Sequence, residues 1–160
     1  MIGVKLICAG GLKEKFYIDA FSEYKKRLSG YCRFTCQELN EIRLPENPAQ
    51  ADIERALKKE GEEIRKNIPK GFFTVAMCIE GRCLDSLELA EIFSQRAMSG
   101  KPNLCFLIGS SYGLDPELKK SADLRLSMSP MTFPHHLARI MLLEQIYRAF
   151  KINEGSKYHK

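Results

Sequence analysis

Short apolar runs alternate along the chain with longer stretches in which apolar residues recur three or four positions apart. The apolar runs contain many β-branched and aromatic residues, and they predict strands over 3–8, 31–39, 72–79, 103–109 and 123–128. The amphipathic stretches predict helices over 13–29, 49–68, 87–98 and 134–152, with a further short helix beginning at Asp115-Pro116-Glu117. Because strands and helices alternate, the expected fold class is α/β, with a mostly parallel sheet flanked by helices.

The last predicted helix is apolar around most of its circumference. Its apolar residues are Leu137, Ile140, Met141, Leu142, Leu143, Ile146, Tyr147 and Phe150. One face of a sheet cannot cover all of them, so we expect one side of this helix to meet a second subunit in a homodimer. A helix inserted deeply into a monomer is the alternative.

Composition places the chain among globular proteins. Its 160 residues, 44% of them hydrophobic and 28% charged, fit a single domain over 1–160 and exclude a disordered chain. The net charge of +5 permits an acidic partner without requiring one. No run reaches about 18 consecutive apolar residues and no secretory signal is visible, so we expect a cytoplasmic protein with no membrane partner.

The cysteines are expected to be reduced thiols in the core. The six are Cys8, Cys32, Cys36, Cys78, Cys83 and Cys105. Neither of the two close pairs has the C-x-x-C spacing that structural zinc sites favour, and several cysteines lie in apolar runs. We therefore predict neither disulfides nor a metal site.

Several familiar catalytic motifs are missing. The chain has no G-x-x-x-x-G-K-[ST] phosphate loop, and the turn at Gly10-Gly11 does not extend to the G-x-G-x-x-G of dinucleotide sites. No G-x-S-x-G elbow occurs, and His135-His136 lack the H-E-x-x-H spacing of zinc proteases. These absences weigh against nucleotide hydrolysis, hydride transfer and proteolysis.

Two segments remain as candidates for chemistry. They are the end of the strand over 103–109 with the turn that follows it, and the stretch over 126–135. Ligands of open parallel sheets bind beyond the carboxyl ends of the strands, and Gly109 would let a ligand approach the backbone there. Two ordinary strand-to-helix turns are the alternative.

Four motifs in these and neighbouring segments resemble one known family. They are I-G-x-x-x-G-L over 108–114, L-S-x-S-x-M-T-F-P-H over 126–135, R-x-x-L-x-E-Q-x-Y-R-A from Arg139, and the terminal Tyr158-His159. In this order they resemble the ribosomal RNA large subunit methyltransferase H family, a group of SPOUT methyltransferases. That resemblance implies a C-terminal trefoil knot, a homodimer and methylation of N3 of a pseudouridine in the helix 69 loop of large-subunit rRNA, on the assembled ribosome.

The resemblance also implies where the cofactor S-adenosylmethionine binds. Its expected contacts are Met77, Gly109, Met128, Ser129, Pro130, Met131, Thr132 and Phe133. Backbone groups can read the edge of adenine, and Met77 and Phe133 can cover its ring. The chain departs from the family at Ser110-Ser111, where a second glycine is common, and at Pro130.

Three residues are candidates for the chemistry at N3, a position that must lose its proton. His159 is the candidate base, Tyr158 a stacking or hydrogen-bonding group, and Arg139 a group that holds the uracil oxygens or a phosphate. A frayed tail is the alternative for Tyr158 and His159, and an ion pair at the dimer interface is the alternative for Arg139. From residue 128 onward cations outnumber carboxylates, so this end is also a candidate for phosphate contacts.

Two other functions stay open. One is a SPOUT enzyme that methylates tRNA, which would share fold and cofactor. The other is a noncatalytic, ribosome-associated module that binds RNA or cofactor without turnover. The RNA that accepts a methyl group separates all three.

Overall fold

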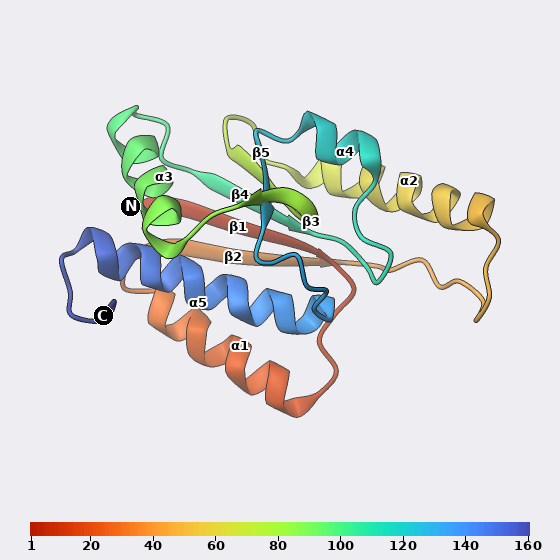
Figure 1. Ribbon diagram of the computed structural model, residues 1–160, viewed down its shortest axis with the longest axis horizontal. Helices are drawn as coiled ribbons and strands as arrows, with labels where there is room; N and C mark the ends of the chain where they lie inside the picture. Colours follow the sequence, from red (N-terminus) through yellow and green to blue (C-terminus); the bar gives the residue numbers. More distant parts are fainter.

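The computed structural model describes all of residues 1–160 and contains one five-stranded sheet (Figure 1). The strands lie in the order β2-β1-β4-β3-β5, and every neighbouring pair is parallel. They are β1 (Ile2–Ala9), β2 (Cys32–Leu39), β3 (Phe73–Cys83), β4 (Leu104–Ile108) and β5 (Leu124–Ser127). The prediction of a parallel α/β sheet is confirmed.

Helices cover both faces of this sheet, as its buried central strands require. They are α1 (Lys15–Leu28), α2 (Gln50–Asn67), α3 (Ser86–Met98), α4 (Pro116–Ser121) and α5 (His135–Asn153). Alternate residues of β1 point to opposite sides, so that Leu6 packs with α1, α3 and α5, whereas Ile7 packs with α2 and α4. Figure 1 shows the same division of the helices.

Most predicted elements agree with the structure to within one or two residues, and β3 differs most. Its prediction ended at 79, whereas the strand continues to Cys83. Met77 and Arg82 both pair with Leu126 of β5, so the residues between them bulge out of the ladder. A Cβ at Gly81 would lie 2.7 Å from the carbonyl carbon of Arg125, so only glycine permits this crossing of β3 and β5.

The last helix is buried on several sides, as predicted. Leu142, Leu143 and Ile146 are fully buried, while Ile140 and Met141 stay half-buried in the single chain. Half of the cysteines are core thiols, and the expectation fails at Cys83, which is exposed at the end of the extended β3.

None of the helices is both long enough and apolar enough to cross a membrane.

Candidate functional site

The two predicted cofactor segments follow the carboxyl ends of β4 and β5. Gly109 comes directly after β4, and a Cβ there would lie 2.0 Å from the carbonyl oxygen of Gly113. No side chain fits that space, so the turn from Gly109 to Leu114 folds back against bare backbone. Met77 is half-buried in β3 and packs against the core beside these turns.

The segment between β5 and α5 has no regular structure, and its backbone donors are mostly free. The hydroxyl of Ser129 accepts from the backbone N–H of Met131 at 3.1 Å, and its carbonyl accepts from the hydroxyl of Ser127 at 3.0 Å. The N–H groups of Ser129, Thr132 and Phe133 donate no hydrogen bond within the chain. Donors held in place without partners fit the edge of an adenine base or the polar groups of an adenosyl cofactor.

The side chains of this segment divide between core and solvent. Met128 packs against the main core, whereas Met131 is 71% exposed and Pro130 and Thr132 are exposed too. A role for these residues in cofactor binding would therefore fall mainly on their backbone groups.

Arg139 lies at the first turns of α5 and is fully buried. Its Nη1 donates to Oε1 of Glu38 at 2.6 Å, and its Nη2 donates to the carbonyl oxygen of Gly10 at 2.8 Å. These bonds join α5 to the carboxyl ends of β2 and β1. To reach the uracil oxygens or a phosphate, Arg139 would have to leave both partners, because no atom of it is exposed.

Tyr158 is folded back onto α5 and is not a frayed end. Its hydroxyl donates to Oε2 of Glu144 at 2.9 Å, and the guanidinium of Arg148 lies 4.6 Å from the centre of its ring. Tyr147 meets the same ring edge-on at 5.2 Å. Partial burial and the Glu144 carboxylate raise the pKa of Tyr158, which keeps its hydroxyl a donor near neutral pH. Beside it, Nδ1 of His159 is buried and has no hydrogen-bond partner.

Of the three predicted catalytic residues, Arg139 lies near the start of α5 on the side of the cofactor segments, whereas Tyr158 and His159 follow the end of this helix. The start of α5 contacts Gly10 at the carboxyl end of β1, whereas its last turn contacts Tyr31, which precedes β2, through Lys151 at 3.0 Å. A helix of 19 residues is about 28 Å long. The side chain of Tyr158 returns along α5 as far as Glu144, whereas the cofactor segment over 128–133 precedes the first residue of this helix, and Figure 1 shows the C-terminus at the far end of α5 from that segment.

The predicted basic C-terminal region is largely neutralised. Arg139 pairs with Glu38, Arg148 with Glu144, and Lys151 with Glu154. Of the lysines and arginines from residue 128 onward, only Lys157 and Lys160 form no salt bridge with a carboxylate. Fewer charges are thus available for phosphates than the sequence suggested.

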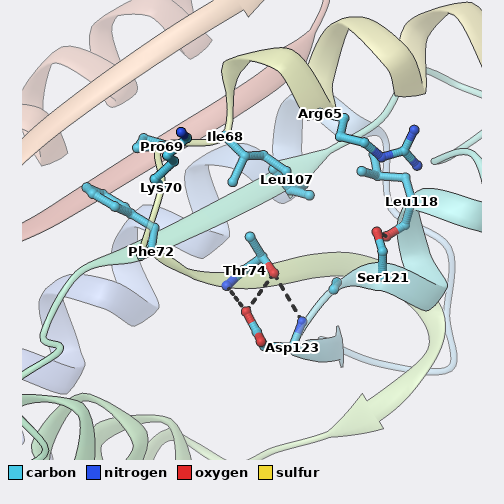
Figure 2. Close-up of a pocket in the computed structure, with 12 residues that line it drawn as sticks. Arg65, Ile68, Pro69, Lys70, Phe72, Thr74, Leu107, Leu118, Ser121 and Asp123 are labelled. Atoms are coloured by element: carbon cyan, nitrogen blue, oxygen red, sulfur yellow. Dashed lines mark hydrogen bonds between the residues drawn. The ribbon is translucent and has the colours of Figure 1, made fainter.

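A cavity of about 390 Å³ lies elsewhere, between α2, α4 and the start of β3. Figure 2 shows Thr74 and Asp123 inside it, where the Asp123 carboxylate accepts from the backbone N–H and the hydroxyl of Thr74 at 2.7 and 2.8 Å. These bonds fasten β3 to the start of β5. None of the predicted site residues lines this cavity.

The sequence indicated Arg148 only as one of several cations that could contact phosphates, and it did not predict that Glu144 and Arg148 together hold Tyr158. Oε1 of Glu144 accepts from Nε and Nη2 of Arg148 at 2.9 and 2.6 Å, while its other oxygen holds Tyr158. The spacing of four residues between a glutamate and an arginine was a visible signal for the ion pair. The contact between Glu144 and Tyr158 forms only because the tail after α5 folds back onto this helix. No local sequence pattern predicts that fold of the tail.

The chain is an α/β protein whose parallel strands end in polar, irregular turns, at the edge where open sheets of this class bind their ligands. A family described as "Predicted SPOUT methyltransferase" matches residues 2–159. The chain belongs to this SPOUT methyltransferase family.

Full-length relatives narrow the comparison further. The chain is 43% identical to ribosomal RNA large subunit methyltransferase H of Clostridium novyi (strain NT) over 159 residues, which is 99% of this chain and 100% of the relative. It is 47% identical over 158 residues to the protein of the same name from Bifidobacterium adolescentis, covering 98% and 99% of the two chains. Against that of Streptococcus pyogenes serotype M5 the identity is 45% over 157 residues, with coverage of 98% and 99%.

Proposed function

We propose that this protein is an S-adenosylmethionine-dependent methyltransferase that methylates N3 of a pseudouridine in the helix 69 loop of large-subunit rRNA, on the assembled ribosome. The observation that carries the proposal is the free backbone N–H groups of Ser129, Thr132 and Phe133 after the end of β5, in a chain whose full-length relatives are named for ribosomal RNA methylation. Such a substrate would be met in the cytoplasm.

The cofactor segments would act mainly by positioning. S-adenosylmethionine supplies an activated methyl group when bound, so the chain's own residues need to align the acceptor with that group and exclude water. Backbone N–H groups of Ser129, Thr132 and Phe133 would hold the cofactor, with Met128, Pro130 and Met131 contributing backbone groups. The turn at Gly109 and the side chain of Met77 would border it.

The residues proposed for the acceptor are Tyr158 and His159. His159 would take the proton from N3 through its other ring nitrogen, Nε2, because its Nδ1 is buried and has no partner within the chain. Tyr158, held by Glu144 and backed by Arg148, would stack on or donate to the uracil ring. Arg139 would serve as a positioning residue, because its bonds to Glu38 and Gly10 fix the start of α5 beside the cofactor segments.

A homodimer would bring these two groups together. Since they lie at opposite ends of α5, a two-fold axis that sets the α5 helices of two chains antiparallel would place the tail of one chain beside the cofactor of its partner. Helix α1 lies beside α5 and exposes Phe16 and Ile18 to the extent of 64% and 43%. These apolar side chains, with the half-buried Ile140 and Met141, support α1 and α5 as the dimer face.

A trefoil knot in the C-terminal half is also part of the proposal. Met77 and Arg82 both pair with Leu126, so the end of β3 crosses β5 just before the segment that leads to α5, and this crossing supports the proposal. Refolding tests it: a stable domain fused to the C-terminus should slow threading and refolding markedly, whereas the same domain at the N-terminus should not.

The experiment that tests the activity is transfer of labelled methyl from S-adenosylmethionine to RNA. The acceptors are assembled ribosomes, free large-subunit rRNA, tRNA, and ribosomes that lack the pseudouridine. Label on pseudouridine-containing ribosomes alone is the expected result. Label on tRNA would replace the proposal with a SPOUT enzyme that methylates tRNA. Cofactor binding without label on any of these RNAs would favour a noncatalytic, ribosome-associated module.

Mixing two inactive variants tests the shared site. His159→Ala leaves the cofactor segments intact, and Gly109→Val leaves the tail intact. If the site is shared, exchanged subunits form one intact site in each mixed dimer, and about a quarter of wild-type activity returns at equal mixing. If each chain uses its own tail, mixing restores nothing.

A further inference from the structure

Glu60 is a carboxylate on the buried face of α2, where it is only 6% exposed. Its neighbours on that face are Ala56, Gly61 and Ile64, while Glu62 and Glu63 on the same helix are exposed. No lysine or arginine forms a salt bridge with it, so the cost of taking this charge out of water is not offset by a cation. A buried, unpaired glutamate on a helix that carries many surface charges calls for an explanation beyond packing.

Both contacts of Glu60 are with segments that flank the proposed cofactor site. Its Oε1 accepts from the backbone N–H of Ile42 at 3.0 Å, in the connection that leaves the carboxyl end of β2. The buried hydroxyl of Ser110, directly after Gly109, lies close enough to the carboxylate to oppose the rise in its pKa. The Glu60 carboxylate thus bonds the connection after β2 and lies near the turn after β4.

Gly61, the next residue of α2, lies in close contact with the turn after β4. A Cβ at Gly61 would lie 2.6 Å from the Cβ of Asp115, the residue that caps α4 by accepting from the N–H of Leu118 at 3.2 Å. The turn from Gly109 to Asp115 is therefore held on one side by α2 and closed on the other by its own backbone. The charged group that acts on Glu60 is Glu41, which is also acidic, while Asp115 faces the neighbouring Gly61.

We propose that Glu60 is a positioning residue for the cofactor site, which holds the connection after β2 through Ile42 and, where Gly61 packs on Asp115, keeps α2 against the turn after β4 so that the edge at Gly109 stays in its binding shape. This inference rests on the proposed function, since it takes that edge as the place where S-adenosylmethionine binds. The role differs from that of the cofactor-binding residues, because Glu60 acts through the loops and touches no ligand itself.

Stability and positioning make opposite demands on this residue. Burial raises the pKa of Glu60, because the charged form is the one that loses hydration. Replacing a buried charge with an apolar side chain of similar size is often neutral or stabilising. If Glu60 only filled space, an apolar replacement would leave the protein at least as stable and its loops unchanged. If Glu60 holds the two loops in place, the same replacement would make both loops less ordered.

The test compares Glu60→Met with Glu60→Gln, and uses Glu62→Gln on the exposed face of α2 as the control. S-adenosylmethionine affinity is measured by calorimetry, thermal stability by circular dichroism, and loop order by amide hydrogen exchange over 40–44 and 109–115. Glu60→Met is expected to melt at or above the wild-type temperature, bind the cofactor about tenfold more weakly and exchange faster in both loops. Glu60→Gln keeps an acceptor for Ile42 and should restore affinity to within about twofold.

The outcomes separate this inference from the proposed function. If the wild-type protein binds no S-adenosylmethionine, the proposed function fails first. If the wild type binds and Glu60→Met binds equally well, the positioning role is overturned, whatever happens to exchange in the loops. Weaker binding in Glu60→Met together with an equal loss in Glu62→Gln would also overturn it.

Discussion

Two arginines near the two ends of α5 show how differently one residue type can be used in the same helix. Arg139 near the start is completely buried and spends two of its donors on Glu38 and Gly10. Arg148 near the end keeps 25% of its side chain exposed, pairs with Glu144 and lies against the ring of Tyr158. The first ties α5 to two strands of the sheet, and the second holds the half-buried Tyr158 of the C-terminal tail on the helix.

The contrast follows from what surrounds each end. The start of α5 meets the carboxyl edge of the sheet, where parallel strands end and turns must be held in place. The last turns meet a tail of a few residues that has little core of its own. An arginine that is buried with good partners secures a fold, whereas one at the rim can orient a neighbour at low cost. Predictions about these two ends therefore separate stability from activity.

The largest effect is expected at Arg139. Arg139→Met keeps apolar volume but removes both bonds to β1 and β2, which should lower the free energy of unfolding by about 3 kcal/mol. Urea unfolding measures it. The matched variant Arg148→Met removes a partly exposed pair and should cost about 1 kcal/mol or less. Equal losses in the two variants would show that the two ends do not differ as described.

At the other end we expect a loss of activity without a loss of stability. His159→Ala removes the proposed base and should reduce methyl transfer about a hundredfold, while the affinity for S-adenosylmethionine stays unchanged. Tyr158→Ala should act in the same direction, because it removes the ring held by Glu144 and Arg148. Single-turnover transfer and calorimetry provide the two readouts. Unaltered turnover in both variants would remove them from the catalytic site.

Gly109 tests the carboxyl edge next to the start of α5. In Gly109→Ala the new Cβ would meet the Gly113 carbonyl at 2.0 Å, and a backbone neighbour cannot rotate away. We expect about tenfold weaker cofactor binding in a protein that still folds. Gly30→Ala, where nothing lies within 4 Å, is the control and should bind normally. Normal affinity in a folded Gly109→Ala would exclude this turn from the site.

The sequence predicted the elements well and their assembly less well. The run from Leu104 to Ile108 is apolar on both faces, and Asp115-Pro116 marks a helix start, so local chemistry was enough to place them. The extension of β3 to Cys83 was missed because its pairing with β5 is a contact between distant segments. Similarly, Arg139 was a candidate for substrate binding because the sequence contains no sign that Glu38 lies 2.6 Å from it.

The site divides in the same way. Gly109 and the stretch over 128–133 could be predicted because they follow predicted strands and because their motifs resemble a known family. Glu60 does not stand out, since a glutamate in a helix of alternating charges has the pattern of a solvated face. Its burial comes from how α2 lies over the turns after β2 and β4, which only the assembled fold defines.

The smallest effect concerns pH at the start of α5. Burial and the neighbouring His136 lower the pKa of His135, against a smaller opposing effect of Glu41. The folded chain therefore binds this proton less tightly than the unfolded chain, whose histidine titrates near about 6.5, so stability should fall as the pH drops below that value. For a half-buried group the loss at pH 5 should stay below about 1 kcal/mol. Urea unfolding between pH 5 and 8 should show this slope in the wild type and a flatter one in His135→Gln, whereas equal slopes would mean that other groups carry the acid sensitivity.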